Sequence, residues 1–215
     1  MIKLVILDFD GTMADTRSLI VRTMQKVIAT LHLDKRTDEE CAAMIGLPLK
    51  ETFTTLLPIS KEQGLECERL YREIFAASDP IKSVNLFPKV LETIAALHSK
   101  GITLTIASSR GHESLDAYVE EMRLAPYIHY VLGAEDVEHA KPQPDAVLKT
   151  LRELGFTPEE TLVVGDMTYD ILMGSRAGAH TCGVTYGNGT REELLSVNAE
   201  SIIDDFEQLL TICQE

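Results

Sequence analysis

The sequence predicts an α/β protein: a doubly wound, parallel, Rossmann-like sheet core with an inserted helical-bundle cap. Three observations lead to this prediction. Mostly apolar runs at 2–7, 102–107 and 162–164 are typical of strands buried on both faces of a parallel sheet. Helical segments alternate with such runs in the second half of the chain, as in successive strand-helix-strand units. The stretch between the first two strands is far longer than one crossover requires.

The first element is a strand over residues 2–7, and it runs directly into Asp8, Asp10, Gly11 and Thr12. Alternate side chains of a strand point to the same side, so Asp8 and Asp10 begin on one side of the backbone. Parallel sheets bind ligands at the carboxyl ends of their strands. Two carboxylates at close range repel unless a cation or a proton lies between them, so the pair indicates a Mg²⁺ site. A plain turn after a strand is the alternative interpretation.

The next element is an insertion, because about a hundred residues separate Asp8 from Ser108 whereas a crossover needs some thirty. The intervening residues have helical periodicity that Gly and Pro interrupt. We therefore expect a helical cap over residues 16–82 and an α/β core over residues 1–15 and 83–215. Within the cap, helical segments are expected at 19–31, 41–45, 52–57 and 65–77.

After the insertion, helices and strands alternate to the end of the chain. The expected helices begin near residues 88, 113, 145 and 168, and a last helix covers 204–212. The expected strands cover 102–107, 128–132, 162–164, 181–184 and 201–203. The right-handed crossover rule then fixes the hand of the sheet.

Polar residues follow two of these later strands. The strand over 102–107 ends at Ser108 and Ser109, whose hydroxyls suit a phosphate at the amino end of the next helix. Lys141 lies in the loop after the strand over 128–132, directly before a proline. A helix cap and a solvated surface charge are the respective alternatives for the serines and the lysine.

A third strand, over 162–164, leads into Gly165 and Asp166, and Asp170 follows in the first turn of the next helix. A helix dipole stabilises a carboxylate at that position, although Asp170 could equally be a helix cap. Together the strand ends and the loop supply a nucleophile, a proton carrier, phosphate ligands and metal ligands. These are the groups that phosphoryl transfer requires.

With these motifs the chain resembles the Mg²⁺-dependent phosphatases of the haloacid dehalogenase superfamily, over essentially its whole length. The resemblance rests on the motif from Asp8 to Thr12, on Ser108 and Lys141, and on the motif from Gly165 to Asp170. It implies a C1-type helical cap that closes on the core and selects the substrate. The segments GLPLKETF and LGAEDVEHAKPQPDAV are most similar to phosphoglycolate phosphatases and the related pyrophosphatases.

The resemblance also implies roles for the motif residues. Asp8 would be the nucleophile that forms an aspartyl-phosphate, and Asp10 would be the general acid for the leaving group and then the base for water. The candidate phosphate-binding residues are Ser108, Ser109 and Lys141. The candidate Mg²⁺ ligands are Asp8, the backbone carbonyl of Asp10, Asp166 and Asp170, the last bound directly or supporting the metal shell.

Other functions remain open from the sequence. A β-phosphoglucomutase-like isomerase shares the fold and the motifs, but such mutases usually carry a His and an Arg where this chain has Ile20 and Leu49. A non-enzymatic phospho-Asp switch needs neither a general acid nor a cap, so Asp10 and a cap of roughly sixty residues favour an enzyme. Dehalogenases of the superfamily lack the second acid of the opening motif, which also argues against dehalogenation.

The composition narrows the partners and the compartment. A 45% share of apolar and a 25% share of charged residues are typical of a soluble globular protein. The net charge of −14, with no Lys/Arg cluster, argues against nucleic acid or an acidic membrane and leaves a small phosphorylated metabolite. The four cysteines lack metal-site spacing, and the first apolar run is too short for a signal peptide or a membrane span. We therefore expect free thiols, cytoplasmic residence and, by default, a monomer.

Overall fold

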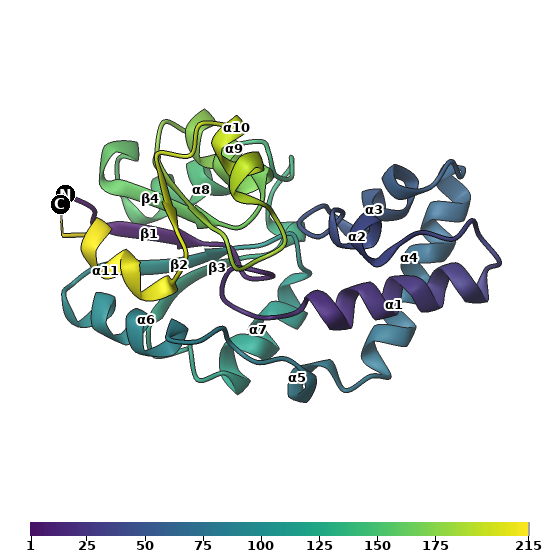
Figure 1. Cartoon of the computed structure of the whole chain (residues 1–215). Helices are drawn as coiled ribbons and strands as arrows, with labels where there is room; N and C mark the ends of the chain where they lie inside the picture. The colour runs from purple at the N-terminus through teal and green to yellow at the C-terminus, as the bar shows by residue number, and fades with distance from the viewer. Residues whose placement is uncertain (215) are drawn as a thin grey trace.

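The computed structural model describes residues 1–214, and its centre is a six-stranded sheet in the order β3-β2-β1-β4-β5-β6 (Figure 1). The strands are β1 (Leu4–Leu7), β2 (Thr103–Ala107), β3 (Ile128–Leu132), β4 (Thr161–Gly165), β5 (His180–Val184) and β6 (Ser201–Ile203). All neighbouring strands run parallel, and β1 pairs with both β2 and β4. The predicted α/β class is thereby confirmed. This order brings the residues that follow β1, β2 and β4 to one edge of the sheet.

Helices cover both faces of the sheet (Figure 1). One face carries α6 (Val90–Ser99), α7 (His112–Glu121) and α11 (Leu209–Ile212), and the other carries α8 (Asp145–Leu154), α9 (Thr168–Arg176) and α10 (Arg191–Ser196). Val5 and Leu7 pack into the core on the first side, whereas Leu4 and Ile6 pack into a separate core with α8 and α9. This burial on both faces explains why the sequence of β1 is apolar without alternation.

Most of the residues between β1 and the sheet-covering helix α6 form helices that lie beyond the carboxyl ends of the strands, on the right of Figure 1. They are α1 (Arg17–Thr30), α2 (Asp38–Ala42), α3 (Leu49–Leu56) and α4 (Lys61–Ala76), and the short helix α5 (Pro80–Ser83) follows them and contacts α7. Helix α4 packs against both α1 and α3, and it begins at a capping box in which Ser60 and Gln63 bond reciprocally. We propose that residues 16–82 act as a cap unit on a core formed by the remaining residues.

The prediction of a last helix over 204–212 is wrong for its first residues. The structure has an extended start, a 3₁₀ turn η3 (Phe206–Gln208) and only then α11. The reason is local hydrogen bonding, because the Asp205 carboxylate accepts from the Glu207 amide while the Gln208 side chain accepts from the amides of Asp204 and Asp205. Such side-chain bonds compete with a helix start.

Several short elements were not expected. They are α5, α10 and two further 3₁₀ turns, η1 (Ala134–Asp136) and η2 (Pro158–Glu160). Helix α6 begins at Val90 rather than near residue 88, because Lys89 takes a left-handed conformation with φ of 67°. The remaining expected strands and helices are present, with ends that shift by a few residues.

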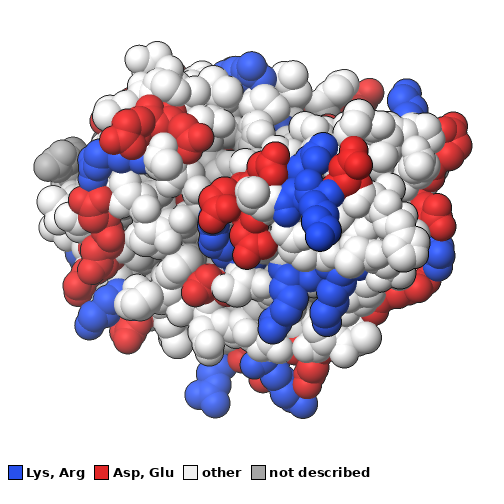
Figure 2. All heavy atoms as spheres, turned by 45° about the vertical axis from the view of Figure 1, so that its right-hand side comes forward, with Lys and Arg blue, Asp and Glu red and all other residues white. Residues whose placement is uncertain are grey.

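The surface charges and the state of the cysteines can be compared with the expectations from composition. Figure 2 shows acidic and basic side chains intermingled on the face turned forward there. Within residues 1–214 no helix is long and apolar enough to cross a membrane. All four cysteines are buried and free, as expected.

Candidate active site

Asp8 lies immediately after β1 and is central to the site. Its amide donates to the carbonyl of Val164 at 2.9 Å, which extends the pairing of β1 with β4 by one residue. Its carboxylate Oδ1 accepts from Lys141 Nζ at 2.5 Å, and Oδ2 accepts from Thr12 Oγ1 at 3.3 Å. Asp8 is only 6% exposed, and burial raises its pKa more than the charge of Lys141 lowers it. This carboxylate therefore lies in a site where nearby charges act strongly.

Three buried carboxylates meet beside Lys141. Asp8, Asp166 and Asp170 each place one carboxylate oxygen within 4.8 Å of the others. Lys141 Nζ donates to Asp8 and also to Asp170 Oδ1, at 2.7 Å. Burial, followed by the charge of Asp170, raises the pKa of Asp166 to about 7. Converging, dehydrated carboxylate oxygens are the donor set of a hard divalent cation, so these residues fit the Mg²⁺ implied by the sequence.

Asp166 is held by a close-packed backbone. The amide and the side chain of Asn188 donate to its Oδ2 at 2.6 and 2.9 Å. Gly11 has φ of +91°, and a Cβ built there would lie 2.3 Å from the same oxygen. A Cβ at Gly187 or Gly189 would likewise come within 2.3 and 2.2 Å of Asp166 atoms. These contacts fix the carboxylate in one orientation and require glycine at the approaching turns.

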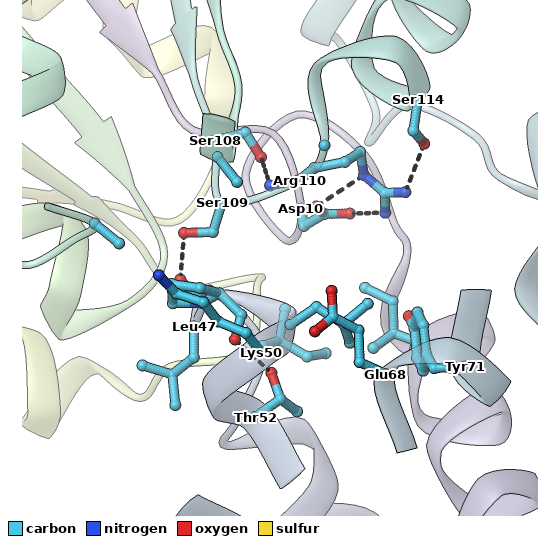
Figure 3. A pocket seen from close by; sticks show the side chains of 18 of the residues that line it. Asp10, Leu47, Lys50, Thr52, Glu68, Tyr71, Ser108, Ser109, Arg110 and Ser114 are labelled. Atoms are coloured by element: carbon cyan, nitrogen blue, oxygen red, sulfur yellow. Dashed lines mark hydrogen bonds and ion pairs between the residues drawn. The ribbon is translucent and has the colours of Figure 1, made fainter. Parts of the chain in front are cut away.

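Asp10 lies at the same strand end but is bound differently. Its Oδ1 accepts from Arg110 Nη2 at 2.5 Å and its Oδ2 from Arg110 Nε at 3.1 Å (Figure 3). The pair is buried, with 8% of the Arg110 side chain and 12% of the Asp10 side chain exposed. Both oxygens of the expected general acid are thus occupied by one guanidinium. Arg110 is not among the site residues predicted from the sequence.

Arg110 is surrounded by aromatic rings as well as by Asp10. Its guanidinium carbon lies 4.9 Å from the ring centroid of Tyr118 and 5.2 Å from that of Phe75. Phe75 belongs to α4, so the inserted helices contribute directly to this environment. Burial opposes the charge of Arg110, but the attraction of Asp10 outweighs it and raises the pKa of Arg110 above its ordinary value. Arg110 also donates to Ser114 Oγ at 3.2 Å.

The two serines after β2 face different partners. Ser108 Oγ accepts from the Arg110 amide at 3.1 Å, whereas Ser109 Oγ donates to the carbonyl of Gly46 at 2.6 Å (Figure 3). Ser109 therefore joins the core to the turn between α2 and α3. Ser108 stays next to the strand ends, and we retain it as a proposed phosphate ligand. A phosphate role for Ser109 remains a prediction.

A cavity of about 620 Å³ connects these groups with the inserted helices. Asp8, Asp10 and the two serines line it from the core, and Gly46, Leu47, Lys50 and Tyr71 are among the residues that line it from α2 to α4 (Figure 3). Arg17 Nη1, at the start of α1, donates to Asn188 Oδ1 at 3.4 Å. The volume suits a small molecule.

Of the predicted site residues, the structure thus brings Asp8, Lys141, Asp166 and Asp170 together, and it places Asp10, Ser108 and Ser109 along the adjoining cavity. It adds Arg110 and Asn188. The sequence offers a weak signal for Asn188, which lies between two glycines after β5, as in a tight loop. It offers none for Arg110 beyond its place in the loop after β2.

Comparisons with known proteins identify the family of this chain. A family model described as haloacid dehalogenase-like hydrolase matches residues 5–184. The chain is 35% identical over 210 residues to a probable phosphatase, IndB, from Dickeya dadantii (strain 3937), covering 96% of this chain and 91% of that protein. It is 32% identical over 211 residues to the pyrophosphatase PpaX from Anoxybacillus flavithermus (strain DSM 21510 / WK1), covering 98% and 96%.

A solved structure also matches along the chain. It is a predicted phosphoglycolate phosphatase from Haemophilus somnus 129PT, with a TM-score of 0.89 and 20% identity, covering 98% of this chain and 97% of that one. At this identity the likeness shows the fold alone. The match extends over the sheet and the inserted helices together.

Proposed function

Because this chain belongs to the haloacid dehalogenase-like hydrolase family, we propose that it is a Mg²⁺-dependent phosphohydrolase acting on a small phosphorylated metabolite through an aspartyl-phosphate. The observation that carries the proposal is the contact of one buried carboxylate, Asp8, with Lys141 and two further acids. Asp170 does cap α9, since its Oδ2 accepts from the Met167 amide at 3.1 Å, but neither a helix cap nor an ordinary turn explains why three buried carboxylates converge beside Lys141. Such an arrangement is costly unless it serves a bound charge.

Asp8 is the proposed nucleophile. Its carboxylate oxygen forms a bond to phosphorus while the bond from phosphorus to the leaving oxygen breaks, and a water later releases phosphate from the acyl phosphate. Lys141 and the hydroxyl of Ser108 are the proposed ligands of the phosphoryl oxygens and offset their charge. Bound Mg²⁺, held by Asp8, Asp166 and the Asp10 carbonyl with support from Asp170, would supply further neutralisation of charge.

Asp10 is the proposed acid and base. It would protonate the departing oxygen and afterwards take a proton from the attacking water. The position of Asp10 beside the cavity, two residues after Asp8, is consistent with that role. In this structure both of its oxygens are bound to Arg110, so it must turn away from Arg110 to act.

The proposed substrates resemble phosphoglycolate or pyrophosphate. The names of the related phosphatase and pyrophosphatase support this class, as does the size of the cavity. A phosphosugar isomerase is disfavoured because Ile20 and Leu49, which stand where mutases usually carry a His and an Arg, line the cavity with apolar side chains. A cytoplasmic location and a monomeric state remain predictions.

The proposal is tested by phosphate release across pyrophosphate, phosphoglycolate, sugar phosphates, nucleotides and an aryl phosphate, with Mg²⁺ and with EDTA. Asp8→Asn removes the nucleophile, and Asp15→Asn makes the same chemical change at an exposed side chain seven positions later. Selective, Mg²⁺-dependent release that only Asp8→Asn abolishes supports the proposal. Release that survives in Asp8→Asn contradicts the aspartyl-phosphate mechanism, and a phosphoenzyme that persists for minutes without turnover indicates a phosphate switch.

A further inference from the structure

We propose that Arg110 determines substrate specificity by binding a second anionic group of the substrate, a carboxylate or a phosphate, in place of Asp10. The inference rests on the proposed phosphatase function, because it assumes that the first phosphoryl group occupies Asp8 and Lys141. It assigns a substrate class to the cavity: small phosphates with a second anion a few bonds away.

The first step of the argument is that Asp10 and Arg110 cannot remain paired during turnover. The guanidinium engages Oδ1 and Oδ2 of Asp10 at once, at 2.5 and 3.1 Å from Nη2 and Nε. An acid that must reach a leaving oxygen needs at least one oxygen within hydrogen-bond distance of it. The bidentate geometry therefore describes a resting arrangement, from which Asp10 has to be released.

The second step is that Arg110 cannot be left without an anion. Its side chain is 8% exposed and packs against Phe9, Phe75 and Tyr118, and Ser114 offers it only a neutral oxygen. Removing one partner of a buried ion pair leaves an uncompensated charge, which is strongly destabilising. Another anion must take the place of Asp10 as it leaves.

Two acids that line the cavity already have partners within residues 1–214. Glu68 faces the pair from the other side of the cavity (Figure 3). Arg72 Nη2 lies 2.7 Å from the Glu68 carboxylate. Glu135 accepts a hydrogen bond from the His112 amide at 3.0 Å. The proposed replacement is therefore an anion of the cavity's occupant.

The third step is that a substrate anion can make this exchange at little cost. A guanidinium binds carboxylates and phosphates through the same two-pronged geometry, so the charge of Arg110 stays paired. Asp8 and Asp10 are two residues apart and line one cavity, so the two anions of the substrate have to lie close together. Phosphoglycolate and pyrophosphate meet this requirement, whereas ethyl phosphate lacks the second anion. Binding of the correct substrate would thus free Asp10.

The test compares kcat/KM for phosphoglycolate, pyrophosphate and ethyl phosphate in the wild type, Arg110→Met and Arg110→Lys. We expect the wild type to prefer a substrate with a second anion by about tenfold or more, the size of one charge-assisted contact. Arg110→Met should bring that ratio close to one, and Arg110→Lys, which keeps the charge but loses the fork, should give an intermediate value. The two anionic substrates show whether a carboxylate or a phosphate is preferred.

Arg72→Met is the matched control, because it removes a positive charge from the same cavity without touching Asp10. If Arg72→Met lowers the preference for a second anion as much as Arg110→Met does, the preference comes from the overall positive charge of the cavity, and the proposal is overturned. An equal loss for all three substrates in the Arg110 variants also overturns it, since that result indicates a merely structural role.

A binding experiment separates this proposal from the proposed function. In an Asp8→Asn background, isothermal titration measures the affinities for phosphoglycolate and ethyl phosphate without turnover. Adding Arg110→Met should weaken phosphoglycolate binding about tenfold more than ethyl phosphate binding. Equal weakening refutes the role of Arg110 even if the wild type proves to be a phosphatase. A selective loss supports that role even if turnover fails with every substrate tested.

Discussion

The buried acids Asp8, Asp166 and Asp170 should make the metal-free protein less stable as the pH rises. The pKa of Asp166 is raised from 3.8 to about 7, chiefly by burial and then by the charge of Asp170. When the pH lies between 3.8 and about 7, Asp166 in the folded protein keeps a proton that it has lost in the unfolded chain. The folded state therefore binds more protons, and the free energy of unfolding falls with rising pH across this window. The contribution is fully present below pH 3.8 and is lost once the pH has passed about 7.

The size of this effect follows from the two pKa values. Each pKa unit corresponds to about 1.4 kcal/mol, so the window from 3.8 to about 7 gives an upper limit of about 4 kcal/mol. That is a large part of the roughly 5–15 kcal/mol that stabilises a typical domain. The raised pKa of Asp8 acts in the same direction. A divalent cation among the three carboxylates removes the need for the proton, so Mg²⁺ should stabilise the protein most at high pH.

The assay is urea unfolding between pH 4 and 8, in EDTA and in millimolar Mg²⁺, for the wild type and Asp166→Asn. Acids whose pKa is lowered, such as Asp136 and Asp145, contribute the opposite slope. The difference between the two proteins therefore reports Asp166 together with its effect on the pKa of Asp8. In EDTA the wild type should lose stability relative to Asp166→Asn as the pH rises. Parallel pH profiles for the two proteins, or stabilisation by Mg²⁺ that is independent of pH, would refute the reasoning.

Three further predictions follow from single contacts. Asp10→Asn should lower turnover about 100-fold or more while Mg²⁺ still binds through the backbone carbonyl, and unchanged steady-state turnover would exclude an acid-base role. Tyr118→Phe should raise the free energy of unfolding by about 1 kcal/mol in urea denaturation, because the buried Tyr118 hydroxyl has no hydrogen-bond partner within residues 1–214. A stability loss would show that this hydroxyl has a partner. Gly165→Ala should weaken Mg²⁺ binding and lower the melting temperature, because the new Cβ would lie 2.2 Å from Cβ and Cγ of Asp170. Calorimetric Mg²⁺ titration checks this, and an unaltered affinity would contradict it.

The strand ends were predictable because one local rule places them. Mostly apolar runs locate β1, β2 and β4, and parallel pairing then brings the residues that follow them to one edge. The meeting of Asp8 with Asp166 follows directly. Lys141 was harder to place, since it comes from a loop, yet its position after β3 put it near the same edge.

The residues that were missed depend on contacts that no local pattern encodes. Arg110 reaches Asp10 across 100 residues of chain, and its aromatic neighbour Phe75 comes from an inserted helix. Asn188 reaches Asp166 from the loop after β5. By contrast, α10 carries a readable signal that was overlooked, because Thr190 and Glu193 form a capping box.

The glycine packing around Asp166 sets limits on how this protein could be re-engineered. Gly11, Gly187 and Gly189 leave no room for even one added carbon, so a mutational library that samples them should yield mostly inactive clones. Leu47, in the turn before α3, and Lys50, in α3, line the same cavity. The Leu47 side chain has no polar atom, and Lys50 Nζ lies 3.9 Å from Glu51. Libraries that vary Leu47 and Lys50 can therefore explore new leaving groups while the reacting carboxylates keep their positions.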